Sequence, residues 1–153
     1  MADYKAPLRD IRFVLNEVFE ADALWQSLPG LDGAIDAETA DAMLEEAGKI
    51  TIAPLNRSGD EEGAQWNDGE VTTPSGFKAA FKTYAEGGWV GLGGNPEFGG
   101  LGMPKTLGVQ VEEMVYGANN SFALYPALTA GCCLALDAHG SEELKQAYLP
   151  NMY

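Results

Sequence analysis

Apolar residues recur at helical intervals along the first third of the chain, and polar or helix-breaking residues separate these stretches. The spacing of the first stretch predicts a helix over about residues 7–21. Residues 21–28 carry a shorter pattern, which predicts one or two further helical turns before a Pro-Gly pair. Asp36 is a good N-cap for a third helix, which we expect Pro54 to end.

Helical periodicity returns in the second half of the chain. One helix is expected from Phe77 to the Gly87-Gly88 pair, with its aromatic residues largely on one face. Another begins after Pro104, and the apolar positions that form its buried stripe are Leu107, Val111, Met114, Val115 and Ala118. Ser141 is placed to cap a last helix, whose first turn holds two glutamates.

Residues 122–138 form the most apolar stretch, and they consist largely of Ala, Leu, Gly and Cys. We expect a helix that Ser121 caps and that Pro126 interrupts. Because this helix is apolar on nearly every side, it is expected to be surrounded by other protein. Its small residues either let neighbouring helices approach closely or leave space for a ligand.

Two stretches lack helical periodicity. Residues 56–73 are polar, which predicts a long surface loop or connector. Residues 87–102 are rich in glycine, which predicts an irregular loop with several glycines at positive φ. Trp89 and Phe98 are expected to anchor that loop by being at least partly buried. The whole pattern predicts an all-α fold of five or six main helices in one compact unit, without a confident strand.

Composition and charge narrow the function classes. The 153 residues are 46% hydrophobic, and 23 acidic against 9 basic residues give a net charge of −14. Such a chain offers no basic stripe for nucleic acid or for an anionic membrane. It contains no continuous apolar run of about 18 residues and no signal-peptide pattern at its N-terminus, so we expect a cytoplasmic protein.

No complete active site follows from residue chemistry alone. Lys105-Thr106 lies after glycines as in a phosphate-binding loop, but Pro104 replaces the glycine whose N–H such a loop needs. The dinucleotide fingerprint fails in the same way at Pro96. His139 is the only histidine, and beside a glycine it is expected to cap helix carbonyls rather than act in catalysis.

The remaining candidate groups have simpler structural explanations. Cys132 and Cys133 point about 100° apart on a helix, so they cannot share a metal ion, and we expect two reduced, buried core residues. The carboxylates of 60–62 and of Glu112-Glu113 are expected on a solvated loop and a polar helix face. We therefore expect no metal site in this chain.

Three stretches together resemble the acyl-CoA dehydrogenases. Residues 7–18, PLRDIRFVLNEV, are similar to the N-terminal extension of a large-subunit bacterial subfamily that includes 3-methylmercaptopropionyl-CoA dehydrogenases. Residues 88–104 resemble the family's Gly-Trp, Pro-Glu and Gly-Gly-x-Gly-x-Pro signature. Residues 139–150 resemble the approach to the flavin-binding β-domain. The resemblance spans nearly the whole chain, with residues 1–35 as an extension and residues 36–153 as the N-terminal helical domain.

The resemblance implies a larger enzyme that uses FAD. In that family a glutamate removes the α-proton of an acyl-CoA, a hydride passes to the flavin, and an electron-transfer flavoprotein reoxidises it. The flavin-holding strand and the catalytic glutamate are expected beyond Tyr153, so this chain is expected to be a fragment without the β-barrel and C-terminal helical domains, and inactive alone. The family usually forms dimers or tetramers, so a homo-oligomer is expected.

The resemblance also implies a role for the small-residue helix as one wall of the acyl pocket. Its expected substrate-binding residues are Ala123, Ala127, Leu128 and Gly131, although they could equally serve only close helix packing. The glycine-rich loop is expected to be a tight turn rather than a flavin contact, and the sequence identifies no cofactor-binding residue. An alternative function is a stand-alone, non-catalytic helical binding or interaction module. The acyl chain length does not follow from the sequence.

Overall fold

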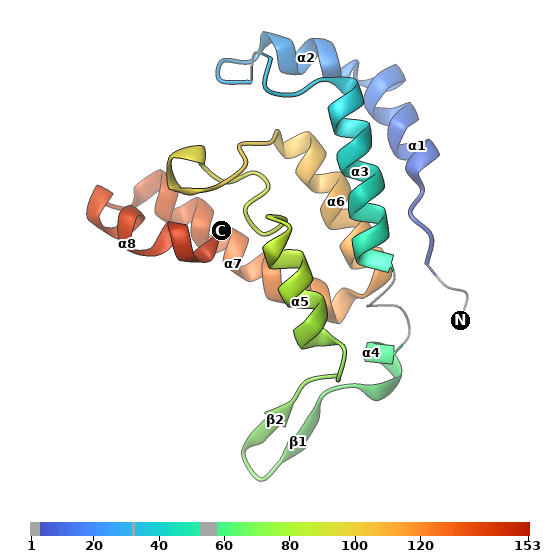
Figure 1. Ribbon diagram of the computed structural model, residues 1–153, viewed down its shortest axis with the longest axis vertical. Coiled ribbons are helices and arrows are strands. Elements are labelled where there is room, and N and C mark those ends of the chain that lie inside the picture. The colour runs from blue at the N-terminus through green and yellow to red at the C-terminus, as the bar shows by residue number, and fades with distance from the viewer. Residues whose placement is uncertain (1–3, 32, 53–57) are drawn as a thin grey trace.

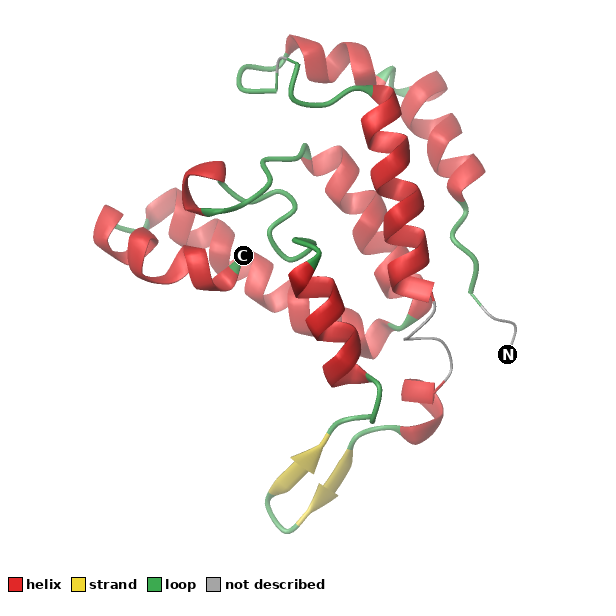
Figure 2. Ribbon diagram, viewed as in Figure 1, coloured by secondary structure: helices red, strands yellow, loops and turns green. Residues whose placement is uncertain are grey.

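Helices dominate the computed structural model, which describes residues 4–31, 33–52 and 58–153 (Figures 1 and 2). The α-helices are α1 (Leu8–Phe13), α2 (Ala21–Ser27), α3 (Ala37–Ile52), α4 (Ser58–Glu62), α5 (Phe77–Glu86), α6 (Lys105–Ala118), α7 (Asn120–His139) and α8 (Glu142–Met152). A short π-helix, η1 (Val14–Val18), follows α1, and a 3₁₀-helix, η2 (Pro96–Phe98), lies between α5 and α6. The predicted all-α fold is confirmed, with one small β-hairpin added.

The core lies where α3 packs beside α6 (Figure 1). Leu44 of α3 and Leu107, Val111 and Met114 of α6 are almost completely shielded from solvent. This confirms the predicted α6 stripe up to Val115. α5 joins the same core through aromatic contacts with α7, which are edge-to-face between Phe77 or Tyr84 and Phe122.

The N-terminal segment differs from the predicted continuous helix over residues 7–21. α1 passes into the π-helix η1, and the chain then bends at Glu20, whose φ of 46° is left-handed. α2 starts again at Ala21. The apolar spacing predicted one continuous helix because the segments on both sides of the bend bury apolar residues in the same core. Leu15 and Trp25 are among these residues.

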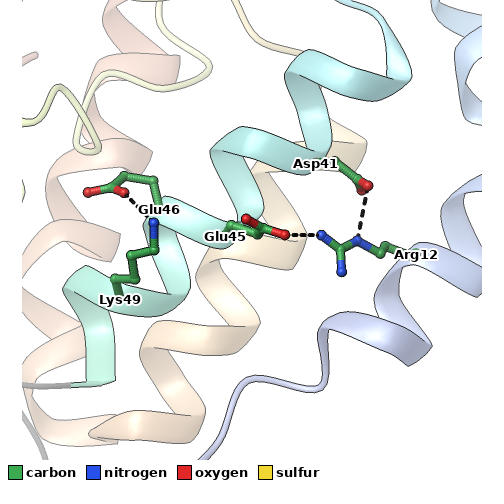
Figure 3. A network of polar contacts seen from close by, with 5 residues as sticks. All are labelled: Arg12, Asp41, Glu45, Glu46 and Lys49. Atoms are coloured by element: carbon green, nitrogen blue, oxygen red, sulfur yellow. Dashed lines mark hydrogen bonds and ion pairs between the residues drawn. The ribbon is translucent and has the colours of Figure 1, made fainter.

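Two ties attach these N-terminal helices to the body. The Trp25 indole Nε1 donates a hydrogen bond to Thr106 Oγ1 of α6 over 2.8 Å. Arg12 reaches α3, where its Nε contacts Asp41 Oδ2 at 3.0 Å and its Nη2 contacts Glu45 Oε1 at 2.6 Å (Figure 3). The extension therefore shares the core of the helical domain.

Asp36 caps α3 as predicted. Its Oδ1 accepts a hydrogen bond from the Thr39 backbone N–H over 2.7 Å, and the hydrogen bonds from Thr39 lower the pKa of the Asp36 carboxyl. Pro54, the expected end of this helix, lies outside the described residues.

The predicted polar connector instead holds α4 and a hairpin. Strands β1 (Gln65–Asn67) and β2 (Glu70–Thr72) pair antiparallel, so the expectation of a loop throughout residues 56–73 is wrong for this part. Asp68 and Gly69 connect them with φ values of 46° and 92°, as a type I′ turn requires. The Asp-Gly pair was the available sequence signal, but strands of three residues show no measurable alternation.

The glycine-rich loop between α5 and α6 matches its prediction. Gly88, Gly99 and Gly102 have positive φ. Trp89 and Phe98 are both buried, with exposed fractions of 9% and 3%. Two apolar anchors thus hold an irregular segment that has only one short 3₁₀ turn of its own.

α7 begins two residues earlier than predicted and is less enclosed. The cap is Asn119 rather than Ser121, because the Asn119 side chain accepts the hydrogen bond from Phe122 N over 2.9 Å. The helix continues through Pro126. The described part of this chain does not enclose it on all sides, since Leu128 is 76% exposed, and its enclosure by other protein stays a prediction. α7 thus packs on one side only.

By length and composition alone, α7 is long and apolar enough to cross a membrane. It is the one helix in the described part of the chain that meets this criterion. One such helix is weak evidence, because core helices of water-soluble proteins pass the same test. The buried residues of α7 face α5, α6 and α8 within this fold, and they include Phe122, Ala123, Pro126 and Cys133.

The predicted cap of the last helix is present, and one of the two cysteines is buried. Ser141 caps α8, since its Oγ accepts a hydrogen bond from Leu144 N over 3.3 Å, as predicted. Cys133 is buried, and burial raises the pKa of its thiol, but Cys132 is exposed, so the prediction of two buried cysteines holds for one of them. Both are free thiols.

Candidate functional site

A cavity of about 410 Å³ opens where α5, the glycine-rich loop, α6 and α7 meet. Its lining comes from four elements and the C-terminal residue: Tyr84, Trp89, Val90, Leu92, Gly93, Gly94, Met103, Lys105, Gly108, Val111, Glu112, Val115, Tyr116, Ala123, Pro126, Ala127, Ala130, Cys133, Leu134, Asp137 and Tyr153. The cavity depends on the small size of the α7 side chains, because alanines stand where larger residues would fill it.

The walls are mainly apolar and aromatic. Val111 and Val115 of α6 and Ala123 and Ala127 of α7 line the cavity together with the aromatic residues Tyr84, Trp89, Tyr116 and Tyr153. An apolar wall with few polar groups is the usual environment of a bound small molecule. This cavity therefore suits the apolar part of a ligand.

The polar groups at the cavity are mostly satisfied within the chain. Lys105 Nζ pairs with Glu112 Oε1 at 3.0 Å, two turns along the same helix. Burial, with a smaller contribution from Glu112, raises the pKa of Tyr84 to about 12. The Trp89 indole Nε1 is buried and has no hydrogen-bond partner among the described residues. Lys105 and Glu112 thus pair with each other, and the Tyr84 phenol stays neutral at physiological pH.

Asn95 holds the glycine-rich loop against the C-terminal helices. Its Nδ2 donates to Asp137 Oδ1 over 3.0 Å, and its Oδ1 accepts from Glu97 N over 3.0 Å. Its backbone N–H donates to the Tyr153 hydroxyl over 3.4 Å. The Tyr153 ring lies so close to Gly94 that a Cβ there would be only 2.6 Å from it. Loop, α7 and chain end therefore form one wall.

A family model described as the acyl-CoA dehydrogenase N-terminal domain matches residues 56–153. This chain belongs to the acyl-CoA dehydrogenase family. It is 38% identical to 3-methylmercaptopropionyl-CoA dehydrogenase of Ruegeria pomeroyi, over 97% of this chain and 26% of that protein. It is 32% identical to a butyryl-CoA dehydrogenase of Syntrophomonas wolfei, over 99% of this chain and 25% of that protein.

A third relative is a broad-specificity linear acyl-CoA dehydrogenase of Mycobacterium tuberculosis, 30% identical over 95% of this chain and 24% of that protein. The chain thus spans about a quarter of the length of the curated relatives it matches. The resemblance seen in the sequence is confirmed at the level of the family and of its N-terminal helical domain.

The structure separates the four residues predicted to contact substrate in this acyl-CoA dehydrogenase domain. Ala123 and Ala127 line the cavity. Leu128 and Gly131 do not line it and are exposed on another side of α7. Contact of all four with an acyl group stays a prediction.

Sequence reasoning missed most of the cavity. Tyr84, Trp89 and Tyr116 come from three elements that only the fold brings together. A signal existed for Lys105 and Glu112, since a spacing of seven puts both on one helix face. Their pairing was not predicted, although the polar helix face of Glu112-Glu113 was.

Metal binding finds no support in the described residues, among which no three His, Cys, Asp or Glu side chains come together. His139 is exposed at the end of α7. Lys105 and Thr106, considered above for phosphate binding, contact Glu112 and Trp25 instead. The feature that the described residues do form is the apolar cavity.

Proposed function

We propose that this chain is the N-terminal domain of an FAD-dependent acyl-CoA dehydrogenase and forms one wall of its acyl pocket. The observation that carries the proposal is the apolar cavity, in which the small residues Ala123 and Ala127 leave space beside α6. The three relatives named above are each called a dehydrogenase of an acyl-CoA. The substrate class we propose is accordingly an acyl-CoA thioester.

The open side of α7 supports a larger assembly. Leu124 and Leu128, which lie one turn apart on the side of α7 away from the cavity, are 50% and 76% exposed. Large apolar side chains gathered on one side of a helix usually meet another protein surface. We propose that flavin-binding and catalytic parts of the same enzyme cover this side, in a homo-oligomer that passes electrons to an electron-transfer flavoprotein.

The described residues that line the cavity do not fit FAD by themselves. The pyrophosphate of FAD needs cations or unpaired backbone N–H donors. Lys105 is the only cation among the residues that line the cavity, and Glu112 already pairs with it. We therefore propose that other parts of the enzyme hold the flavin, and that this domain supplies shape and water exclusion around the acyl chain.

We propose that the domain contributes to substrate binding by burying the acyl chain against the apolar cavity walls. Each methylene group that leaves water for an apolar site gains about 0.8 kcal/mol. Val111 and Val115 offer such a surface, and Ala127 sets how much room remains opposite them. Larger side chains at position 127 would take the place of acyl carbons.

The test is Ala127→Phe in the full-length enzyme, with acyl-CoA substrates of increasing chain length. We expect the ratio of kcat/KM values to shift toward shorter chains. Ala79→Phe, at an exposed position of α5, is the matched control and should leave the ratio unchanged. A large loss of stability with an unchanged chain-length preference would show that Ala127 serves packing and that the pocket assignment is wrong.

The alternative function, a stand-alone and non-catalytic interaction module, is distinguished from the dehydrogenase domain by isolating the native protein. Antibodies against this domain should recover a protein that contains flavin and oxidises acyl-CoA with an artificial electron acceptor. The 153-residue chain alone should lose any flavin on dialysis and show no such oxidation. A native protein with neither flavin nor activity would favour the interaction module.

A further inference from the structure

Asp137 brings a carboxylate without an ion-pair partner to the wall of the cavity. It is half-buried in the last turn of α7 and lines the cavity. The other charged lining residues, Lys105 and Glu112, pair with each other at 3.0 Å. Lys145 is near enough for its charge to interact with Asp137, but its Nζ pairs with Glu142 at 3.0 Å. Among the described residues, Asp137 therefore keeps its charge for something else.

Asn95 determines which atom of this carboxylate is left over. The loop that carries Asn95 packs beside α8 and the end of α7 (Figure 1). Asn95 Oδ1 accepts a hydrogen bond from the Glu97 backbone N–H over 3.0 Å, so its Nδ2 is the group that faces Asp137. This Nδ2 donates to Asp137 Oδ1 over 3.0 Å. Asp137 Oδ2 has no hydrogen-bond partner in the described part of the chain and is not sealed from solvent.

The two ends of the cavity differ in polarity along α7. Ala123 and Ala127 lie at the apolar end, and Asp137 lies at the other end, where the Tyr153 hydroxyl and Asn95 meet. A ligand with an apolar tail and a polar arm therefore fits in one direction, with its tail beside the alanines and its arm beside Asp137. A carboxylate oxygen held in this way accepts a hydrogen bond from an N–H or O–H group of that arm.

The distance along α7 matches one donor of an acyl-CoA thioester. Ala127 and Asp137 are ten residues apart, which is about 15 Å along a helix. An extended chain advances about 1.2 Å per bond, and about eleven bonds join the terminal methyl carbon of octanoyl-CoA to the first amide nitrogen of its CoA arm, or about 13 Å. With the methyl group beside Ala127, this amide N–H comes to lie beside Asp137.

We propose that Asp137 is a substrate-binding residue whose Oδ2 accepts a hydrogen bond from the first amide N–H of the CoA arm. Asn95 holds the carboxylate in place, so little freedom is lost when the ligand binds. Hydrogen bonds to a charged group contribute more than those between neutral groups. This inference rests on the proposed acyl pocket, and it adds the direction in which the substrate lies along α7.

The experiment compares two octanoyl thioesters that differ only at the proposed contact. The thioester of N-acetylcysteamine keeps the amide, whereas in the thioester of mercaptoethyl acetate an ester oxygen replaces the amide N–H. Isothermal titration calorimetry with the full-length protein, without an electron acceptor, measures both dissociation constants. We expect the wild type to bind the amide about 10-fold more tightly than the ester, because the ester oxygen offers Asp137 no hydrogen.

Asp137→Asn should reduce this preference to less than about 2-fold. Asn95 Nδ2 still needs an acceptor, so the new amide oxygen faces Asn95 and the new amide nitrogen, a donor, replaces Oδ2. Glu97→Gln is the control, since it removes an exposed carboxylate that also interacts with Lys145 but does not line the cavity. It should keep the wild-type preference.

Binding of octanoyl-CoA itself separates this inference from the proposed pocket. If the wild type binds neither octanoyl-CoA nor the two thioesters, the proposed acyl pocket is wrong and this assignment falls with it. If octanoyl-CoA binds but amide and ester bind equally, or the preference survives Asp137→Asn, only the assignment of Asp137 is wrong. Circular dichroism checks folding, and Asp137→Ser removes the same carboxylate with a smaller side chain, so it should also abolish the preference.

Discussion

Tyr84 shows how one buried side chain couples the cavity to pH. Burial among the apolar walls, with a smaller effect of Glu112, raises the pKa of its phenol to about 12 from an ordinary value of 10.0. The protonated form is favoured by folding, so its contribution is complete below pH 10 and is lost as the pH rises toward 12. A rise of this size corresponds to at most about 3 kcal/mol.

We therefore expect wild-type protein to lose more unfolding free energy than Tyr84→Phe between about pH 9 and about pH 11.5. Urea denaturation at each pH measures the difference. Tyr148→Phe, at a tyrosine that is 54% exposed, is the control and should follow the wild-type curve. Parallel curves for wild type and Tyr84→Phe would show that Tyr84 titrates as it does in water.

At the scale of elements, two contacts tie the N-terminal helices to the body, and their magnitudes differ. The partners of Arg12 are partly exposed, so these ion pairs contribute about 0–1 kcal/mol (Figure 3). Trp25 is 1% exposed and fills the space beside α6, and truncating such a residue costs about 3–5 kcal/mol. Burial rather than the ion pair holds the extension.

Trp25→Ala should accordingly destabilise the protein by about 3–5 kcal/mol, whereas Arg12→Met should cost less than about 1 kcal/mol. Urea denaturation compares the two, and limited proteolysis should cleave only the Trp25→Ala protein within residues 4–31. Equal losses for both variants would contradict the dominance of burial.

The hairpin turn carries a prediction of its own. Gly69 has a φ of 92°, so Gly69→Ala should loosen the hairpin by about 1 kcal/mol without lowering the stability of the body. Amide hydrogen exchange of β1 and β2 should accelerate, while the urea midpoint stays constant. Gly108→Ala, in a helix and with open space at its Cβ, is the control and should leave this exchange unchanged. A lower midpoint for Gly69→Ala would mean that the hairpin is part of the cooperative core.

The sequence predicted elements where a local signal determined them. Asp36 and Ser141 cap helices because their side chains accept nearby backbone N–H groups, which is a local event. The bend at Glu20 was not predictable, since its left-handed backbone is unusual for glutamate and reflects packing on both sides. Asn119 rather than Ser121 is the cap, because two polar residues that can cap a helix lie only two positions apart and the sequence does not distinguish them.

The candidate site was predictable only in part, for a related reason. Ala123 and Ala127 lie on one helix face, and the family resemblance pointed to that face. Tyr84 and Trp89 enter the cavity through the packing of α5 and of an irregular loop, and no periodic pattern encodes that arrangement. Long-range packing thus decides most of the cavity wall.

For the whole molecule, net charge and exposed apolar surface act in opposite directions. A charge of −14 keeps copies apart at low ionic strength, whereas the open side of α7 with Leu124 and Leu128 favours contact. Salt shortens the screening length from about 10 Å at 0.1 M to about 3 Å at 1 M. Ionic strength should therefore decide which effect prevails.

We expect the 153-residue chain to be monomeric at low salt and to self-associate reversibly at high salt, as measured by analytical ultracentrifugation. Leu128→Lys should suppress the association. Phe19→Lys adds the same charge at another exposed apolar site, so it serves as the control and should retain most of it. Equal suppression by both variants would assign the effect to charge alone.

The packing of α3 against α6 has a consequence for how such enzymes diverge. The family model covers residues 56–153, which contain α6 but not α3, so its boundary divides the hydrophobic core although the relatives match on both sides of it. Leu44 on one side of that division and Leu107 on the other are both completely buried in one cluster. Recombination at the division would separate residues that must change together, and a chimaera between relatives should therefore inherit residues 4–52 and 58–153 from the same parent.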